Sequence, residues 1–123
     1  MKIVCVCTAG KTRSVWMAEH INRTFPEVTA EARGINGRLA EDRRISIPDI
    51  RSADLILTAS SVHASFLRGM VYGLLIGNMR FAERYAMSSR NMEIVNLPLM
   101  GLWRTEPDRA LDSIDRIIRR RLK

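Results

Sequence analysis

Cysteine is scarce in this sequence, which has only Cys5 and Cys7 among its 123 residues. Both belong to one short apolar run that is typical of an extended strand. Two side chains so close along one strand are poorly placed for an unstrained disulfide. The sequence therefore excludes a disulfide framework, and we expect Cys5 to lie in the core.

Long hydrophobic runs are also missing. The most apolar internal stretch, residues 70–77, is far shorter than a membrane span. The N-terminus has an apolar run of only five residues before a polar loop, which is too short for the apolar core of a signal peptide. We therefore expect a cytoplasmic protein that does not enter a membrane.

Histidine is equally rare, with only His20 and His63 in the chain. Neither has a cysteine, a second histidine or a carboxylate cluster at the spacing of metal ligands. We expect both side chains to pack or to lie at the surface. The sequence indicates no metal site and no cofactor.

The remaining composition is ordinary for a soluble globular protein, with 46% hydrophobic and 27% charged residues. A chain of this length fits one domain, residues 1–123. The formal net charge of +7 favours an anionic partner. Much of the excess lies in residues 116–123, where cations near a helix C-terminus are favourable, so we prefer a solvated helix face to a nucleic-acid patch.

Strand and helix patterns alternate along the chain. Apolar, β-branched runs predict strands, and apolar residues at helical spacing follow Ser14 and Pro107. Ser60 and Ser61 are typical helix caps, as is Thr105 before Pro107. The predicted strands are residues 2–6, 28–32, 53–58 and 92–97; the predicted helices are residues 14–25, a short turn at 48–50, one from 62 and one from about 107, whose buried face comprises Leu111, Ile114, Ile117, Ile118 and Leu122.

This alternation predicts an α/β fold with a parallel sheet covered by helices on both faces. In such sheets, ligands bind beyond the carboxyl ends of the strands, near the switch in strand order. Cys7 stands at such an end. The fold class therefore directs attention to the loop that follows it.

Residues 7–14 read C-T-A-G-K-T-R-S and connect the first strand to the first helix. Backbone N–H groups in such a loop and at the helix start can surround a tetrahedral oxyanion, and Arg13 can add a bidentate clamp. The same field lowers the pKa of a thiol, and a thiolate can attack phosphorus. Cys7 is therefore a candidate nucleophile.

The run V-C-V-C-T-A-G-K-T-R-S-V-W-M-A-E-H resembles the opening of low-molecular-weight protein tyrosine phosphatases, which share a C-x5-R-S loop followed by a helix. The likeness is to a compact bacterial branch, in which A-E-H follows the loop and A-D-L-I opens the third strand, here residues 18–20 and 53–56. Residues 64–90 match that family poorly.

The resemblance implies a doubly wound, four-stranded, flavodoxin-like sheet and a two-step hydrolysis of phosphomonoesters or phosphotyrosine through a phosphocysteine, without a metal. It assigns the nucleophile to Cys7, the phosphate clamp to Arg13 and a hydrogen bond to the cysteine sulfur to Ser14. The residues whose backbone amides would bind phosphate are Thr8, Ala9, Gly10, Lys11, Thr12 and Arg13.

Three positions depart from the family pattern. Gly10 replaces an asparagine with a left-handed backbone, a conformation that glycine reaches unaided. Val15 replaces a proline that favours the helix start. The aspartate that serves as the family's general acid has no counterpart in residues 96–103. Loss of general acid catalysis typically lowers the reaction rate by about 10²- to 10⁴-fold. Of the nearest carboxylates, Glu106 and Asp108, we prefer Asp108 as the acid.

Other interpretations remain open. Cysteine-phosphorylated sugar-transport components have a similar C-x-A-G-x-x-T-S loop and need no general acid, and a non-catalytic phosphate-binding domain would need none either. A nucleotide-binding loop is disfavoured because that motif requires glycine where Cys5 stands. Trp16 and Trp103 could flank a pocket, although packing in the core is the simpler role for each.

Overall fold

Four parallel strands form one sheet in the order β2-β1-β3-β4. The strands are β1 (Lys2–Cys7), β2 (Thr29–Gly34), β3 (Leu55–Thr58) and β4 (Ile94–Asn96). The structure is a computed structural model that describes the backbone of residues 1–77, 94–96 and 102–123, and the side chains of residues 1–70 and 104–123.

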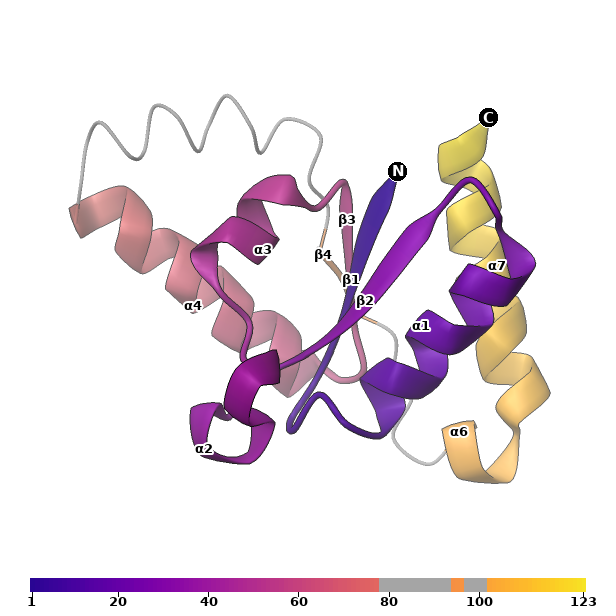
Figure 1. Ribbon diagram of the computed structural model, residues 1–123, viewed down its shortest axis with the longest axis horizontal. Coiled ribbons are helices and arrows are strands. Elements are labelled where there is room, and N and C mark those ends of the chain that lie inside the picture. Colours follow the sequence, from indigo (N-terminus) through magenta and orange to yellow (C-terminus); the bar gives the residue numbers. More distant parts are fainter. Residues whose placement is uncertain (78–93, 97–101) are drawn as a thin grey trace.

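Helices cover both faces of this sheet. Helices α1 and α7 lie on one face, and α3 and α4 lie on the other (Figure 1). The helical elements are α1 (Arg13–Thr24), α2 (Gly37–Ala40), the 3-10 turn η1 (Glu41–Arg43), α3 (Ile47–Ser52), α4 (Ser61–Gly77), α6 (Leu102–Thr105) and α7 (Pro107–Leu122). The predicted doubly wound α/β fold is confirmed.

Side chains of β1 alternate between two hydrophobic cores. Ile3, Cys5 and Cys7 face the core under α1 and α7, while Val4 and Val6 face the core under α3 and α4. All five are at most 2% exposed. This two-sided burial explains why the strand reads as an unbroken apolar run, and it confirms the core position expected for Cys5.

The carboxyl ends of the strands meet at one edge of the sheet. Cys7 pairs with Gly34 of β2, Val6 with Thr58 of β3, and Thr58 with Asn96 of β4. The chain passes from β1 to β2 on one side and then to β3 on the other, so the strand order reverses at β1. Such a switch point is where α/β sheets bind ligands.

Local sequence signals account for two helix boundaries in the N-terminal half of the chain. The α1 helix ends at Thr24, just before Pro26, as predicted. The predicted turn at Pro48 is the helix α3, whose start carries a capping box between Ser46 and Asp49. Helices α2 and η1 were not predicted, because both are too short for a periodic apolar pattern.

Three boundary predictions and one burial prediction were wrong. The second strand, predicted over residues 28–32, extends to Gly34, because pairing with β1 continues to Cys7. The third strand begins two residues later than predicted, at Leu55. Thr105 ends α6 and does not cap α7, which starts at Pro107 with Glu106 at the N-cap position. Leu122 is 38% exposed, because it lies in the last turn of α7.

The remaining positions on the predicted face of the last helix do contact the core. Ile114 and Ile118 are fully buried, and Leu111 and Ile117 pack against the same core while partly exposed. Ala110, which was not predicted, joins them. Among the described helices, none is both long and apolar enough to cross a membrane.

Candidate phosphate-binding site

The loop between β1 and α1 closes tightly on itself at Gly10. Its backbone has φ +69°, the left-handed region that the family resemblance implied for this position. A Cβ atom on Gly10 would lie 2.7 Å from the carbonyl carbon of Arg33 and 2.7 Å from the amide nitrogen of Gly34. The position therefore requires glycine both for its backbone conformation and for this close approach.

The segment after β2 holds the loop from outside. The amide of Ile35 donates to the Cys7 carbonyl at 3.1 Å, and the amide of Asn36 donates to the Thr8 carbonyl at 3.0 Å. From η1, Arg43 donates to the carbonyl of Gly10 at 3.3 Å. These bonds fix the backbone of residues 7–10, which leaves the loop amides oriented before any ligand binds.

The Cys7 sulfur is nearly buried and surrounded by hydrogen-bond donors. The backbone N–H of Gly10 donates to Sγ at 3.3 Å, and the Ser14 hydroxyl lies 3.1 Å from Sγ. Burial raises the pKa of this thiol, but hydrogen bonds from the Ser14 hydroxyl and from the amides of Ser14, Gly10 and Thr12 outweigh it, so the Cys7 pKa is lowered. A lowered pKa increases the fraction of nucleophilic thiolate.

Cys5 has the opposite electrostatics although it lies two residues away. Its side chain is fully buried. Burial raises the pKa of the Cys5 thiol, and the nearby negative charge of Cys7 raises it further. Cys5 is therefore held as an inert, neutral thiol in the core.

Arg13 opens α1 at the end of the loop, with its side chain partly buried. Within the described part of the chain, no carboxylate forms an ion pair with it. Its guanidinium charge contributes to a lowered pKa of His63. The helix start also lacks a side-chain cap: Thr12 occupies the N-cap position but makes no capping hydrogen bond, so the first amides of α1 have no side-chain acceptor there.

His63 is a member of this site that the sequence analysis missed. Its ring lies in the first turn of α4 and is 2% exposed. Nε2 is 3.0 Å from the Thr8 hydroxyl, and Nδ1 is 3.2 Å from the Ser60 hydroxyl. Burial and the charge of Arg13 lower the His63 pKa to about 4, which leaves the ring neutral near pH 7.

A signal for His63 was present in the sequence. It stands three residues after Ser60, at the start of the helix that follows the third strand. Since β1 and β3 are parallel neighbours, the loops that leave their carboxyl ends lie at the same edge of the sheet. The sequence analysis missed His63 because it did not predict that β3 lies next to β1 in the sheet.

Asp108, the expected general acid, lies in the first turn of α7 with an exposed side chain. This end of α7 is at the same edge of the sheet as the loop after β1 (Figure 1). No hydrogen bond or ion pair joins Asp108 to residues 7–14, whereas Glu106 is paired with Arg109 at 3.3 Å. Residues 97–101 and the Trp103 side chain lie outside the described residues.

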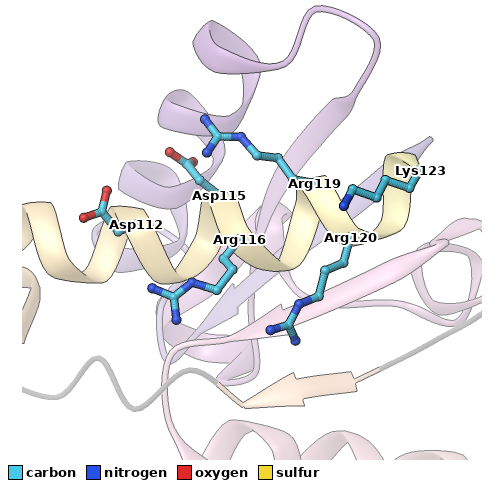
Figure 2. Close-up of a pocket in the computed structure, with 6 residues that line it drawn as sticks. All are labelled: Asp112, Asp115, Arg116, Arg119, Arg120 and Lys123. Carbon is cyan, nitrogen blue, oxygen red and sulfur yellow. The ribbon is translucent and has the colours of Figure 1, made fainter.

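A second group of charges lies on the C-terminal half of α7, around a shallow hollow of about 410 Å³. Figure 2 shows side chains of both signs there: Arg116 and Arg120 project to one side of the helix, and Asp115 and Arg119 to the other. Asp115 is bound to His20 of α1 at 2.6 Å. This end of α7 lies away from the β1–α1 loop (Figure 1), so the group is separate from the candidate site.

The fold is of the flavodoxin-like α/β class, with a parallel sheet covered by helices on both faces. The sequence matches no protein-family model and no curated protein sequence. Among solved structures, it is similar to the YwlE arginine phosphatase from Geobacillus stearothermophilus, with a TM-score of 0.58 and 17% sequence identity. The match covers 97% of this chain and 91% of that one. At this identity the likeness establishes a shared fold.

Proposed function

We propose that this protein is a metal-independent phosphatase that hydrolyses a phosphorylated protein side chain through a phosphocysteine at Cys7. The observation that carries the proposal is the environment of the Cys7 sulfur, which accepts a hydrogen bond from Gly10, contacts the Ser14 hydroxyl and has a lowered pKa. A buried core thiol has no need of these donors. The shared fold with an arginine phosphatase supports the same function.

In the first step, the Cys7 thiolate attacks phosphorus in line. The S–P bond forms while the bond from phosphorus to the leaving group breaks, and the leaving group takes a proton from Asp108. Arg13 and the backbone amides of residues 8–13 bind the three equatorial oxygens, where preorganised donors stabilise the transition state most. A water molecule then attacks phosphorus and gives a proton to the Asp108 carboxylate, while the S–P bond breaks and Ser14 stabilises the departing Cys7 thiolate.

Two kinds of phosphorylated side chain fit this proposal. The sequence resemblance implies phosphotyrosine or another phosphomonoester, and the name of the structural neighbour adds phosphoarginine. Both present a tetrahedral dianion to the same loop, and they differ in whether a P–O or a P–N bond breaks. The discriminating assay compares release of phosphate from a phosphotyrosine peptide and a phosphoarginine peptide at equal concentration.

Turnover of an aryl phosphate between pH 5 and 8 tests the enzyme itself. We expect activity in the wild type and none above background in Cys7→Ser. Absence of turnover in the wild type would falsify hydrolysis. The oxyanion site is tested separately: phosphate and vanadate should raise the Tm of the wild type, and Arg13→Ala should lose this effect.

The second candidate is phosphate binding or transfer without hydrolysis, favoured by the lack of contact between Asp108 and the loop. Cysteine-phosphorylated transport components are one form of it. Incubation with a phosphohistidine protein donor distinguishes the two. Stable label on Cys7 without release of phosphate supports transfer, whereas continuous release supports hydrolysis.

A further inference from the structure

Three side chains from two parts of the chain form a hydrogen-bonded row beside the loop of residues 7–14. The Ser60 hydroxyl contacts Nδ1 of His63 at 3.2 Å, and Nε2 of His63 contacts the Thr8 hydroxyl at 3.0 Å. Ser60 and His63 are 7% and 2% exposed. Thr8, next to Cys7, is exposed. The row therefore runs from the protein interior to the surface of the loop.

The neutral charge state of His63 allows two arrangements of the hydrogen bonds in this row, and a bound anion selects one of them. Because burial and Arg13 lower the pKa of the ring to about 4, His63 is neutral at pH 7, with one N–H group and one acceptor nitrogen. Two hydroxyl partners can satisfy either tautomer. An anion held by the loop amides breaks this symmetry, because it attracts a donor from Thr8 and repels an acceptor.

The favoured arrangement follows from this polarity. Ser60 donates to Nδ1, the N–H at Nε2 donates to the Thr8 oxygen, and the Thr8 hydroxyl proton turns toward the anion. Each donor polarises the next, so the chain strengthens its last bond. All three groups then have partners, and the low pKa of His63 prevents a second ring proton from reversing the first bond.

We infer that Ser60, His63 and Thr8 form a relay that makes the Thr8 hydroxyl a donor to the bound phosphoryl group, with His63 as its positioning residue. The inference rests on the proposed function, because it requires a phosphate in the loop. It adds a side-chain donor to the amides and Arg13. It also gives a specific role to the tautomer of a histidine that does not itself touch the substrate.

Binding of inorganic phosphate and vanadate by variants tests the relay. Removal of a hydrogen bond to a charged group weakens binding by roughly tenfold or more. We expect this for Thr8→Val, and near wild-type binding for Thr8→Ser. His63→Ala should weaken binding at least about threefold, and His63→Gln should recover most of the loss, because its amide nitrogen can occupy the position of Nε2.

The decisive measurement is the double variant Thr8→Val/His63→Ala. If His63 acts through Thr8, the double variant binds phosphate no more weakly than Thr8→Val alone. Losses that add instead mean that His63 supports the fold and not the donor, and they overturn the inference. His20→Gln is the matched control, since His20 binds Asp115 far from the loop, and it should bind phosphate like the wild type.

Nitrogen NMR of the ring reads the tautomer directly and needs no variant. In the phosphate complex, we expect Nε2 to carry the proton and Nδ1 to be the acceptor, and a proton on Nδ1 overturns the inference. If Arg13→Ala abolishes binding but Thr8→Val does not change it, the relay is wrong and the proposed function stands. If the wild type binds neither phosphate nor vanadate, both are wrong.

Discussion

Gly10 and Gly34 approach each other so closely that neither can carry a side chain. A Cβ on Gly10 would lie 2.7 Å from the Gly34 nitrogen, and a Cβ on Gly34 would lie 2.8 Å from the Gly10 nitrogen and 2.6 Å from the carbonyl carbon of Ala9. These contacts pack the loop of residues 7–14 directly on the end of β2. The loop of this protein is thus shaped by two glycines far apart in sequence.

Substitution of Gly10 should therefore be costly even when the new residue tolerates a left-handed backbone. Asparagine adopts positive φ comparatively well, yet Gly10→Asn still meets the backbone of Arg33 and Gly34. We expect the free energy of unfolding to fall by about 1–3 kcal/mol, with weaker phosphate binding. Urea denaturation measures the first and calorimetry the second.

Gly69 provides the matched control for this prediction. It lies within α4, and no atom of the residues that the structure describes stands within 4 Å of the Cβ that alanine would add. Gly69→Ala should raise stability by roughly 0.5–1 kcal/mol, because alanine loses less backbone entropy in a helix. A Gly10→Asn variant as stable as the wild type would show that the loop can move away from β2.

Alkylation should distinguish the two cysteines by pH. The lowered pKa of Cys7 means that thiolate, and hence reaction with iodoacetamide, persists below the pH at which an ordinary thiol protonates. Ser14→Ala should shift the midpoint of the rate profile upward, since it removes one of the stabilising hydrogen bonds. Mass spectrometry should find the label on Cys7, and Cys7→Ser should remain unlabelled while folded because Cys5 is buried and neutral.

His63 should make stability fall in mild acid. Its pKa in the folded protein is about 4, against 6.5 for the ordinary side chain. The unfolded chain therefore binds a proton that the folded chain does not as the pH falls from 6.5 to 4. Relative to His63→Gln, the wild type should lose about 1–3 kcal/mol across this window and none above pH 7. A constant difference between the two urea midpoints would contradict the buried neutral ring.

Asp108→Asn tests the proposed acid through the leaving group. Loss of general acid catalysis should lower kcat/KM, which reports the step that expels the leaving group, by about 10²-fold or more for phenyl phosphate, whose leaving group needs a proton. The loss should be much smaller for p-nitrophenyl phosphate, whose leaving group departs as an anion. Glu106→Gln is the control, because Glu106 is paired with Arg109. Equal losses on both substrates would remove Asp108 from this role.

The arginines at the end of α7 should not contribute to phosphate chemistry. Arg116, Arg119 and Arg120 are exposed and lie far along α7 from its start near the loop. Replacing all three with glutamine should leave kcat/KM for aryl phosphates within about twofold. Nucleic acid remains the disfavoured partner, and salt-sensitive DNA binding that the triple variant loses would reverse that preference.

The sequence was sufficient to predict the position and the local conformation of the cysteine loop, because the residues that form it are neighbours along the chain. Cys7, Gly10, Arg13 and Ser14 span eight residues, and a strand before them and a helix after them leave the backbone few ways to connect. The lowered pKa of Cys7 comes entirely from donors in this stretch. Local geometry could therefore be inferred from local sequence, as could the alternation of strands and helices and most of the buried face of α7.

Only the tertiary structure decided what surrounds that loop. Thr8 and His63 are 55 residues apart and meet because β1 and β3 pair in parallel. The spacing of residues in the sequence does not predict this pairing. The close approach of Gly10 to Gly34 and the support from Arg43 likewise depend on β1 pairing with β2. The sequence by itself predicted a candidate cysteine nucleophile in a loop suited to an oxyanion. The sheet determined which distant side chains orient that loop, because parallel pairing brings the carboxyl ends of all its strands to one edge.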